Sequence, residues 1–199
     1  MTTTFFLVRH GAHALLDRVL LGRTLDVSID DRGHRQATAL AEWFARDRID
    51  VVQSSPRERT LQTARPIAAR LGVPLQIETA LDEIDCGQWS GRGFDELRAR
   101  SDWQEWNRSR STARPPGGES MAEAQQRIVA HLINVHSSHP GGRVVLVSHC
   151  DVIRAAVLHY IGISLDDYDA VEIAPAAVTG LELNGRGGKV LALNTMVPA

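Results

Sequence analysis

Short runs of consecutive apolar residues recur along the chain, and two of them end in a histidine. Residues 5–8 run into the tripeptide Arg-His-Gly at 9–11, and residues 144–147 run into Ser148-His149. Continuous apolar runs of this length are typical of strands buried on both faces of a parallel sheet. Because ligands of such sheets bind beyond the carboxyl ends of the strands, we expect both histidines to face one crevice.

Helical spacing of apolar residues follows these strands. It predicts helices that begin near Asp30, Ser55, Ser120 and Asp151. Ser55 and Ser120 each precede a glutamate by three positions, which is the capping-box pattern, and the Ser55 helix is expected to end at Gly72. The Ser120 helix is expected to bury one apolar face, made of Met121, Ala124, Ile128, Leu132 and Val135.

Further strands complete the pattern. We expect them at 51–52, 74–78, 177–183 and 189–194, the last two joined through the hairpin signal Asn184-Gly185 by a loop longer than the minimum. Strands that alternate with helices are typical of α/β proteins. The sequence therefore predicts a three-layer α/β/α sandwich with a mostly parallel central sheet and an antiparallel edge.

The segment at about 79–117 breaks this alternation. It contains three of the four tryptophans and ends in Pro-Pro-Gly-Gly. A long irregular segment inside a compact fold is usually functional. We expect one domain spanning 1–199, in which this segment is an excursion over the active site.

Composition and charge exclude several classes of protein. The chain is 43% hydrophobic and 23% charged, with a net charge of −2, so no overall field attracts nucleic acid or a membrane surface. No apolar stretch approaches the roughly 18 residues of a membrane span, and no secretory leader is recognised. Two cysteines make no disulfide framework. We expect a cytoplasmic protein.

Residues at the predicted strand ends could bind and transfer phosphate. Arg9 offers a planar charged fork that suits phosphate, and His10 beside it can act as acid, base or nucleophile. Arg59 follows the predicted start at Ser55, where free N–H groups attract anions. Taken alone, the tripeptide at 9–11 and Arg59 are more often structural, and His149 is equally often structural or functional. Together, two histidines, two arginines and two helix N-termini compose a phosphate pocket.

With these residues the chain resembles the histidine phosphatase superfamily, also called the phosphoglycerate mutase-like superfamily. Each match is weak alone, but they occur in family order from residue 4 to about 155. The matching residues are 7–11; Gly22, Arg23 and Asp26; Gly33, Gln36 and Ala37; 54–56 with Arg59, Thr63 and Ala64; Leu81, Glu83, Gly87, Trp89 and Gly91; 116–120; and 147–149.

The resemblance implies a role for each catalytic candidate. His10 would attack the phosphoryl group and form a phosphohistidine that water hydrolyses. Arg9, Arg59 and His149 would hold the phosphoryl oxygens and neutralise charge. Glu83 would protonate the leaving alkoxide and later deprotonate the water. Arginine and imidazolium supply the positive charge, so no metal or other cofactor is expected.

The resemblance leaves some assignments open. Asp82 and Asp85 are acidic neighbours of Glu83 that only the motif alignment sets aside. Leu16 stands where the superfamily has an asparagine that contacts phosphate, which leaves His13 or Arg23 to replace it. The substrate-binding candidates are Gly11, His13, Arg23, Ser148 and Cys150. Cys150 stands where glycine is usual, and we expect a packed side chain rather than a reactive thiol.

The favoured function is a phosphomonoester hydrolase whose partner is a small phosphorylated metabolite. A phosphoglycerate mutase is the main alternative, although such mutases carry a longer insertion after the Glu83 motif. A phosphate-binding protein without turnover is disfavoured because both histidines and the acid are present. A metal site made of His10, His13, His149 and Cys150 is opposed by the adjacent arginine. A homodimer is left open.

Overall fold

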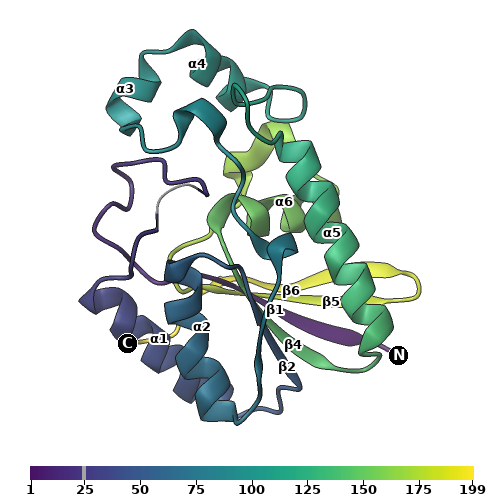
Figure 1. Cartoon of the computed structure of the whole chain (residues 1–199). Coiled ribbons are helices and arrows are strands. Elements are labelled where there is room, and N and C mark those ends of the chain that lie inside the picture. Colours follow the sequence, from purple (N-terminus) through teal and green to yellow (C-terminus); the bar gives the residue numbers. More distant parts are fainter. Residues whose placement is uncertain (24–25) are drawn as a thin grey trace.

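A computed structural model describes residues 1–23 and 26–199 of the chain (Figure 1). Its centre is a six-stranded sheet in the order β3-β2-β4-β1-β5-β6. The parallel strands are β1 (Thr3–Arg9), β2 (Val51–Ser54), β3 (Leu75–Ile77) and β4 (Arg143–Ser148). The antiparallel edge is formed by β5 (Val178–Asn184) and β6 (Gly187–Thr195). The mostly parallel sheet with an antiparallel edge is therefore confirmed.

The two strands that precede the histidines are direct neighbours in this sheet. β1 and β4 pair in parallel register, with Arg9 opposite Ser148. The backbone N–H of His10 donates to the carbonyl oxygen of Ser148 at 3.0 Å. The ring centroids of His10 and His149 lie 5.4 Å apart. The two histidines therefore lie side by side as predicted, but of the two only His10 lines the cavity described below.

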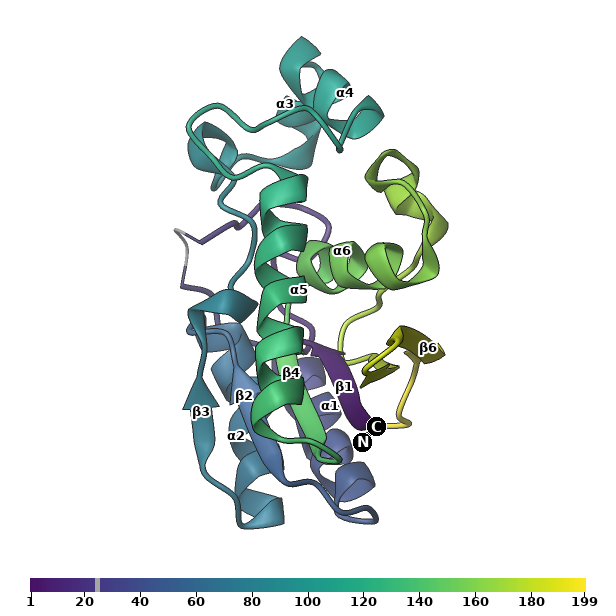
Figure 2. The same cartoon turned by 90° about the vertical axis from the view of Figure 1, so that its right-hand side faces the viewer.

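Helices cover both faces of the sheet (Figure 2). They are α1 (Asp31–Phe44) and α2 (Glu58–Leu71) on one face, and α5 (Met121–Ser138) and α6 (Cys150–Ile161) on the other. Phe5 and Leu7 of β1 pack with α5 and α6, whereas Val8 packs with α1 and α2. Because both faces are buried, the strands are continuously apolar. The three-layer sandwich is confirmed.

Two helices begin at the predicted capping residues. The side chain of Asp30 accepts from the N–H of Gly33 at 2.9 Å and caps α1. Ser120 and Glu123 form a reciprocal capping box at the start of α5. All five apolar residues predicted for the inner face of α5 are buried. Local side-chain chemistry was sufficient to locate these two helices.

The predicted start of α2 at Ser55 is wrong. The helix begins at Glu58, and its N-cap residue Arg57 makes no side-chain cap. The hydroxyl of Ser55 instead lies 2.8 Å from Nε2 of His149, so a tertiary contact replaces the local cap. The helix ends as predicted, because Gly72 adopts the left-handed conformation at φ 70°.

The excursion between β3 and α5 covers the site side of the sheet. It contains α3 (Phe94–Arg98), α4 (Ser101–Arg108) and 3-10 turns at Thr79–Leu81 and Gly87–Trp89. The rings of Trp89 and Trp103 pack edge to face, 5.3 Å apart. Phe94 and Trp103 line the same cavity as His10. Residues of the excursion therefore form part of the cavity wall.

The C-terminal hairpin is tighter than expected. Asn184 pairs with Gly187, so Gly185 and Arg186 alone form the loop. The N–H of Arg186 donates to the side chain of Asn184 at 2.8 Å. This local hydrogen bond stabilises the short turn, so no longer loop is needed to join the two strands.

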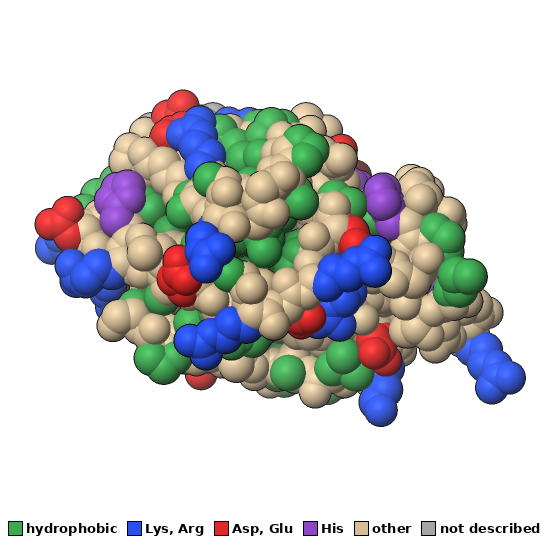
Figure 3. Space-filling model, turned by 90° about the horizontal axis from the view of Figure 1, so that it is seen from below, with side chains coloured by type: hydrophobic (Ala, Val, Ile, Leu, Met, Phe, Trp, Pro, Cys, Tyr) green, Lys and Arg blue, Asp and Glu red, His purple; other side chains and the backbone are tan. Residues whose placement is uncertain are grey.

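The surface carries mixed charge on the face seen from below. Basic and acidic side chains are interspersed there among apolar ones (Figure 3). Within the described residues, no helix has the length and apolar character needed to cross a membrane.

Candidate active site

His10 presents a neutral ring nitrogen at the carboxyl end of β1. Its Nδ1 lies 2.9 Å from the carbonyl oxygen of Gly11, and since a carbonyl only accepts, Nδ1 carries the proton. Burial, followed by the charges of Arg59 and Arg9, holds the pKa of His10 well below its usual value. The ring is therefore neutral, and Nε2 keeps its lone pair for attack.

Gly11 holds this ring in place rather than lining the cavity. Its N–H donates to Oγ1 of Thr63 at 2.9 Å, and Thr63 in turn donates to the carbonyl of Arg59 at 2.8 Å. A Cβ at Gly11 would lie 2.9 Å from the carbonyl oxygen of Gly33. A glycine is required because α1 approaches the loop so closely.

A buried guanidinium group, that of Arg59, and a partly buried one, that of Arg9, act on His10 through their charges. Arg59 is 1% exposed, and its Nη2 contacts the carbonyl of Gly22 at 3.1 Å. Its Nε and Nη1 are buried without a partner in the described part of the chain, and so is Nε of Arg9. Nη1 of Arg9 donates to the carbonyl of Ile173 at 2.7 Å. Unpaired buried cationic nitrogens are costly, and a bound anion would offset that cost.

His149 is fully buried, with both ring nitrogens engaged. Nη2 of Arg59 lies 3.1 Å from Nδ1, and a guanidinium only donates, so Nδ1 accepts. The Nε2–H therefore donates to Oγ of Ser55 at 2.8 Å. Ser55 in turn contacts Oδ1 of Asp82 at 3.3 Å. His149 is thereby tied to the arginine that faces the cavity.

Glu83 lies close to His149 and carries a shifted pKa. Its Oε2 is 3.8 Å from Nδ1 of His149, and its Oε1 accepts from the N–H of Ile84 at 2.9 Å. Burial, reinforced by the carboxylate of Asp151, raises the pKa of Glu83 to about 7. A carboxyl group that is partly protonated at neutral pH can both donate and accept a proton.

The acidic neighbours of Glu83 are used elsewhere. Asp82 accepts from Nε and Nη2 of Arg57 at 2.9 and 2.8 Å. Asp85 accepts from the N–H of Gly87 at 2.9 Å. Of the three carboxyl groups, only that of Glu83 lines the cavity. The geometry therefore favours Glu83 as the proton donor.

Arginines outside the cavity hold the loop that carries Glu83. Arg23 donates to the carbonyl of Glu83 at 2.5 Å and to the carboxylate of Glu119 at 2.6 Å. Arg127 donates to the carbonyls of Ala80 and Asp82 at 2.7 and 2.9 Å. Arg23 thus holds the backbone of Glu83 in place and does not line the cavity.

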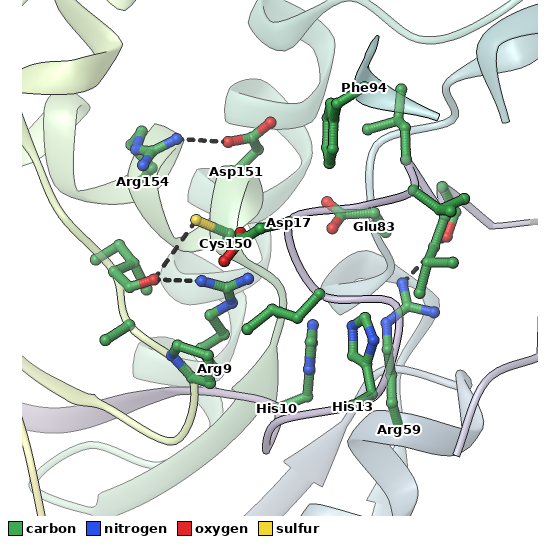
Figure 4. Close-up of a pocket in the computed structure, with 18 of the residues that line it drawn as sticks. Arg9, His10, His13, Asp17, Arg59, Glu83, Phe94, Cys150, Asp151 and Arg154 are labelled. Carbon is green, nitrogen blue, oxygen red and sulfur yellow. Dashed lines mark hydrogen bonds and ion pairs between the residues drawn. The ribbon is translucent and has the colours of Figure 1, made fainter. Parts of the chain in front are cut away.

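These side chains surround a cavity of about 490 Å³ (Figure 4). His10, His13 and Arg59 point into it from one end, with Glu83 beyond them. The sequence-predicted residues that line it are Arg9, His10, His13, Arg59, Glu83 and Cys150. The remaining candidates, which do not line it, are Gly11, Arg23, Ser148 and His149. The hydroxyl of Ser148 donates to the carbonyl of Leu81 at 2.7 Å.

Comparison with models of protein families identifies the family of this chain. The model of the histidine phosphatase superfamily, branch 1, matches residues 5–196. The chain belongs to this superfamily. A relative in Hydrogenobacter thermophilus, phosphoserine phosphatase 1, is 31% identical over 85% of this chain and 82% of its own length. The 2,3-bisphosphoglycerate-dependent phosphoglycerate mutase of Mesorhizobium japonicum is 29% identical over 92% and 94%.

Solved structures of the superfamily share the fold. A mycobacterial glucosyl-3-phosphoglycerate phosphatase superposes with a TM-score of 0.88 at 22% identity, covering 98% of this chain and 100% of that one. The resemblance inferred from the ordered motifs is confirmed by the family match.

Leu16, the first departure from the superfamily pattern, and His13, a candidate to replace the missing asparagine, lie close together in the chain. Both residues line the cavity. His13 is 6% exposed, its ring centroid lies 5.3 Å from that of His10, and its Nδ1 is buried without a partner among the described residues. Burial, then Arg59 and Arg9, lowers the pKa of His13 to about 4. The ring is neutral and carries one N–H donor.

Cys150, a second departure from the superfamily, is a protonated thiol. Its Sγ lies 3.6 Å from the carbonyl oxygen of Ile173. Burial, together with Asp151, raises the pKa of Cys150 to about 11. In residues 1–23 and 26–199, no group of three or more His, Cys, Asp or Glu side chains is arranged to hold a metal ion.

The sequence did not identify the residues at the other end of the cavity. Arg110, Asp151, Arg154 and Tyr168 line it there. In the sequence, Asp151 marks only a predicted helix start. These residues come from three separate segments, so no local spacing could have grouped them.

Proposed function

We propose that this chain is a phosphomonoester hydrolase that acts on a small phosphorylated metabolite through a phosphohistidine on His10. One observation carries the proposal. The unprotonated Nε2 of His10 lies at the end of a cavity flanked by two guanidinium groups, and both have buried nitrogens without a partner among residues 1–23 and 26–199. Such a site suits a phosphoryl dianion and a nucleophile aimed at it.

The first step transfers the phosphoryl group to the enzyme. Arg9 and Arg59 bind the phosphoryl oxygens while Nε2 of His10 attacks phosphorus. The P–O bond to the leaving group breaks, and the proton of Glu83 goes to the departing alkoxide oxygen. Since both nitrogens of His149 are engaged, we assign it the task of holding Arg59 in place.

The second step releases phosphate. The Glu83 carboxylate takes a proton from water, and the resulting hydroxide attacks phosphorus as the P–N bond to His10 breaks. Inorganic phosphate leaves, and both His10 and Glu83 return to their starting protonation states. The same carboxyl group therefore acts first as acid and then as base.

Trapping the covalent intermediate tests the proposal. Brief exposure to a radiolabelled phosphomonoester, followed by quenching, is expected to leave acid-labile, base-stable label on the peptide that contains His10. A chain that shows neither this label nor phosphatase activity in the absence of added metal would contradict it.

The similarity to a phosphoglycerate mutase supports a second candidate function, in which the enzyme returns the phosphoryl group to the substrate. Product analysis with 3-phosphoglycerate separates the two functions, because a hydrolase releases free phosphate and a mutase forms 2-phosphoglycerate. We expect free phosphate as the main product.

His13 is expected to supply the phosphate contact that Leu16 cannot make. A hydrogen bond to a charged group contributes about 1.5–3 kcal/mol, so His13→Ala is expected to weaken binding of inorganic phosphate roughly tenfold or more by calorimetry. Leu16→Asn in the His13→Ala background is expected to recover part of the loss, since it adds an amide donor. The exposed His34 provides the matched control His34→Ala. Unchanged phosphate affinity in His13→Ala would refute the contact.

A further inference from the structure

The outer end of the active-site cavity contains an ion triad, in which Arg110 is buried and Asp151 and Arg154 are partly exposed. Nη1 of Arg110 lies 3.2 Å from Oδ2 of Asp151, and Nη1 of Arg154 lies 2.7 Å from Oδ1 of the same carboxylate. All three residues line the cavity whose other end holds His10. Figure 4 shows Asp151 and Arg154 at the end away from His10, with Glu83 between the two ends.

This triad has one more positive charge than negative. Burial opposes ionisation of Asp151, but Arg110 and Arg154 prevail and lower its pKa, so the carboxylate is ionised between two cations. Arg110 is only 4% exposed. An uncompensated positive charge in such a place is costly unless an anion approaches it.

Arg110 is fixed by the protein, so it serves as a support. Its Nη2 donates to Oδ1 of Asn107 at 2.8 Å, and its guanidinium carbon lies 3.8 Å from the ring centroid of Tyr168. Tyr168 also donates to Asn107 at 3.1 Å. The Nε of Arg110 is buried without a partner among the described residues. Both of its amino groups are engaged and one face is stacked, so we assign Arg110 the task of holding Asp151.

Arg154 has donor capacity to spare. It donates from Nε to the carbonyl of Val171 at 2.8 Å and from Nη1 to Asp151 at 2.7 Å. No acceptor in the described part of the chain takes a hydrogen bond from its Nη2. Its side chain is 15% exposed, so the group is reachable from the cavity yet largely shielded from solvent.

Two acidic residues also line the cavity. Asp17 and Glu172 are both exposed, so water and salt screen their charges more than those of the less exposed triad.

We propose that the alcohol portion of the substrate carries a carboxylate, which Arg154 binds while the phosphoryl group lies against His10. The planar guanidinium fork matches a carboxylate in geometry and charge. The inference rests on the proposed function, because it assigns the leaving-group end of the same cavity. Arg154 is then a specificity-determining residue, and Asp151 and Arg110 position it.

Two pairs of phosphomonoesters that differ mainly at the carboxylate test this inference. They are 3-phosphoglycerate against glycerol 1-phosphate, and O-phosphoserine against phosphoethanolamine. In the wild-type protein we expect kcat/KM to favour the carboxylated member of each pair by about tenfold or more, the size of a lost hydrogen bond to a charged group. Equal kcat/KM within both pairs would overturn the inference without any variant.

The variant Arg154→Gln is expected to reduce this ratio to near one, and Arg154→Lys to give an intermediate ratio. Arg65→Gln, which removes an exposed arginine of α2, is the matched control and should keep the wild-type ratio. A wild-type ratio in Arg154→Gln would remove Arg154 from the inference. If the proposed function itself fails, the phosphohistidine label is absent for every substrate. If only this inference fails, the label forms and the ratios are equal.

Discussion

His10→Ala is expected to lower kcat for p-nitrophenyl phosphate by about 10⁴-fold or more, because removing a covalent nucleophile closes the two-step route. His13 cannot replace His10 without moving, because the centroids of the two rings lie 5.3 Å apart. The radiolabel on the chain should disappear with the activity. Steady-state kinetics and quenched labelling measure the two effects.

Phosphate binding distinguishes lost chemistry from a damaged site in this variant. Arg9 and Arg59 remain after His10→Ala, so inorganic phosphate should still bind, and the melting temperature should stay close to that of the wild type. Turnover that stays within tenfold of the wild-type value would show that His10 is not the nucleophile.

Glu83→Gln is expected to slow hydrolysis of alkyl phosphates by about 10²–10⁴-fold, the usual contribution of a positioned general acid. The first-turnover release of p-nitrophenol should fall far less, because p-nitrophenolate leaves without a proton. Rapid-quench measurement of the first turnover separates this step from the later attack of water. Equal losses for both leaving groups would exclude Glu83 as the proton donor.

The pH profile provides a second measure of the same carboxyl group. Since burial and then Asp151 raise the pKa of Glu83 to about 7, it is protonated below that pH and loses its proton above it. First-turnover cleavage of alkyl phosphates should therefore decline as pH rises through about 7, and Glu83→Gln should remove the decline. Asp85→Asn changes a carboxylate of the same loop that only accepts from Gly87, and this control should keep the wild-type profile.

Local signals predicted most of the fold. The strands were recognisable because both faces of the sheet are covered, which makes their sequences continuously apolar. The capping box at Ser120 was recognisable because it is formed within one turn of helix. Ser55 carried the same signal, but His149 and Asp82 engage its hydroxyl instead. A sequence pattern does not reveal when a distant partner competes for a capping group.

The positions of the two histidines were also predictable from local signals. His10 and His149 directly follow strands, so the position of the strand fixes the position of the histidine. The outer end was not predictable, because Arg110 reaches Asp151 from an excursion with no regular spacing. Its stacking on Tyr168 also joins segments far apart in the chain. Such residues are grouped only by the completed tertiary structure.

Because β1 pairs with β4, we expect activity to appear late in folding. Ser55 and His149 are 94 positions apart in sequence, and β4, which His149 follows, lies between β1 and β2 in the sheet. Contacts between such distant segments form slowly, because a long loop must close first. Helices can form earlier from their own caps. A refolding chain should therefore regain helical signal before it can bind phosphate, and catalysis would report completion of the central sheet.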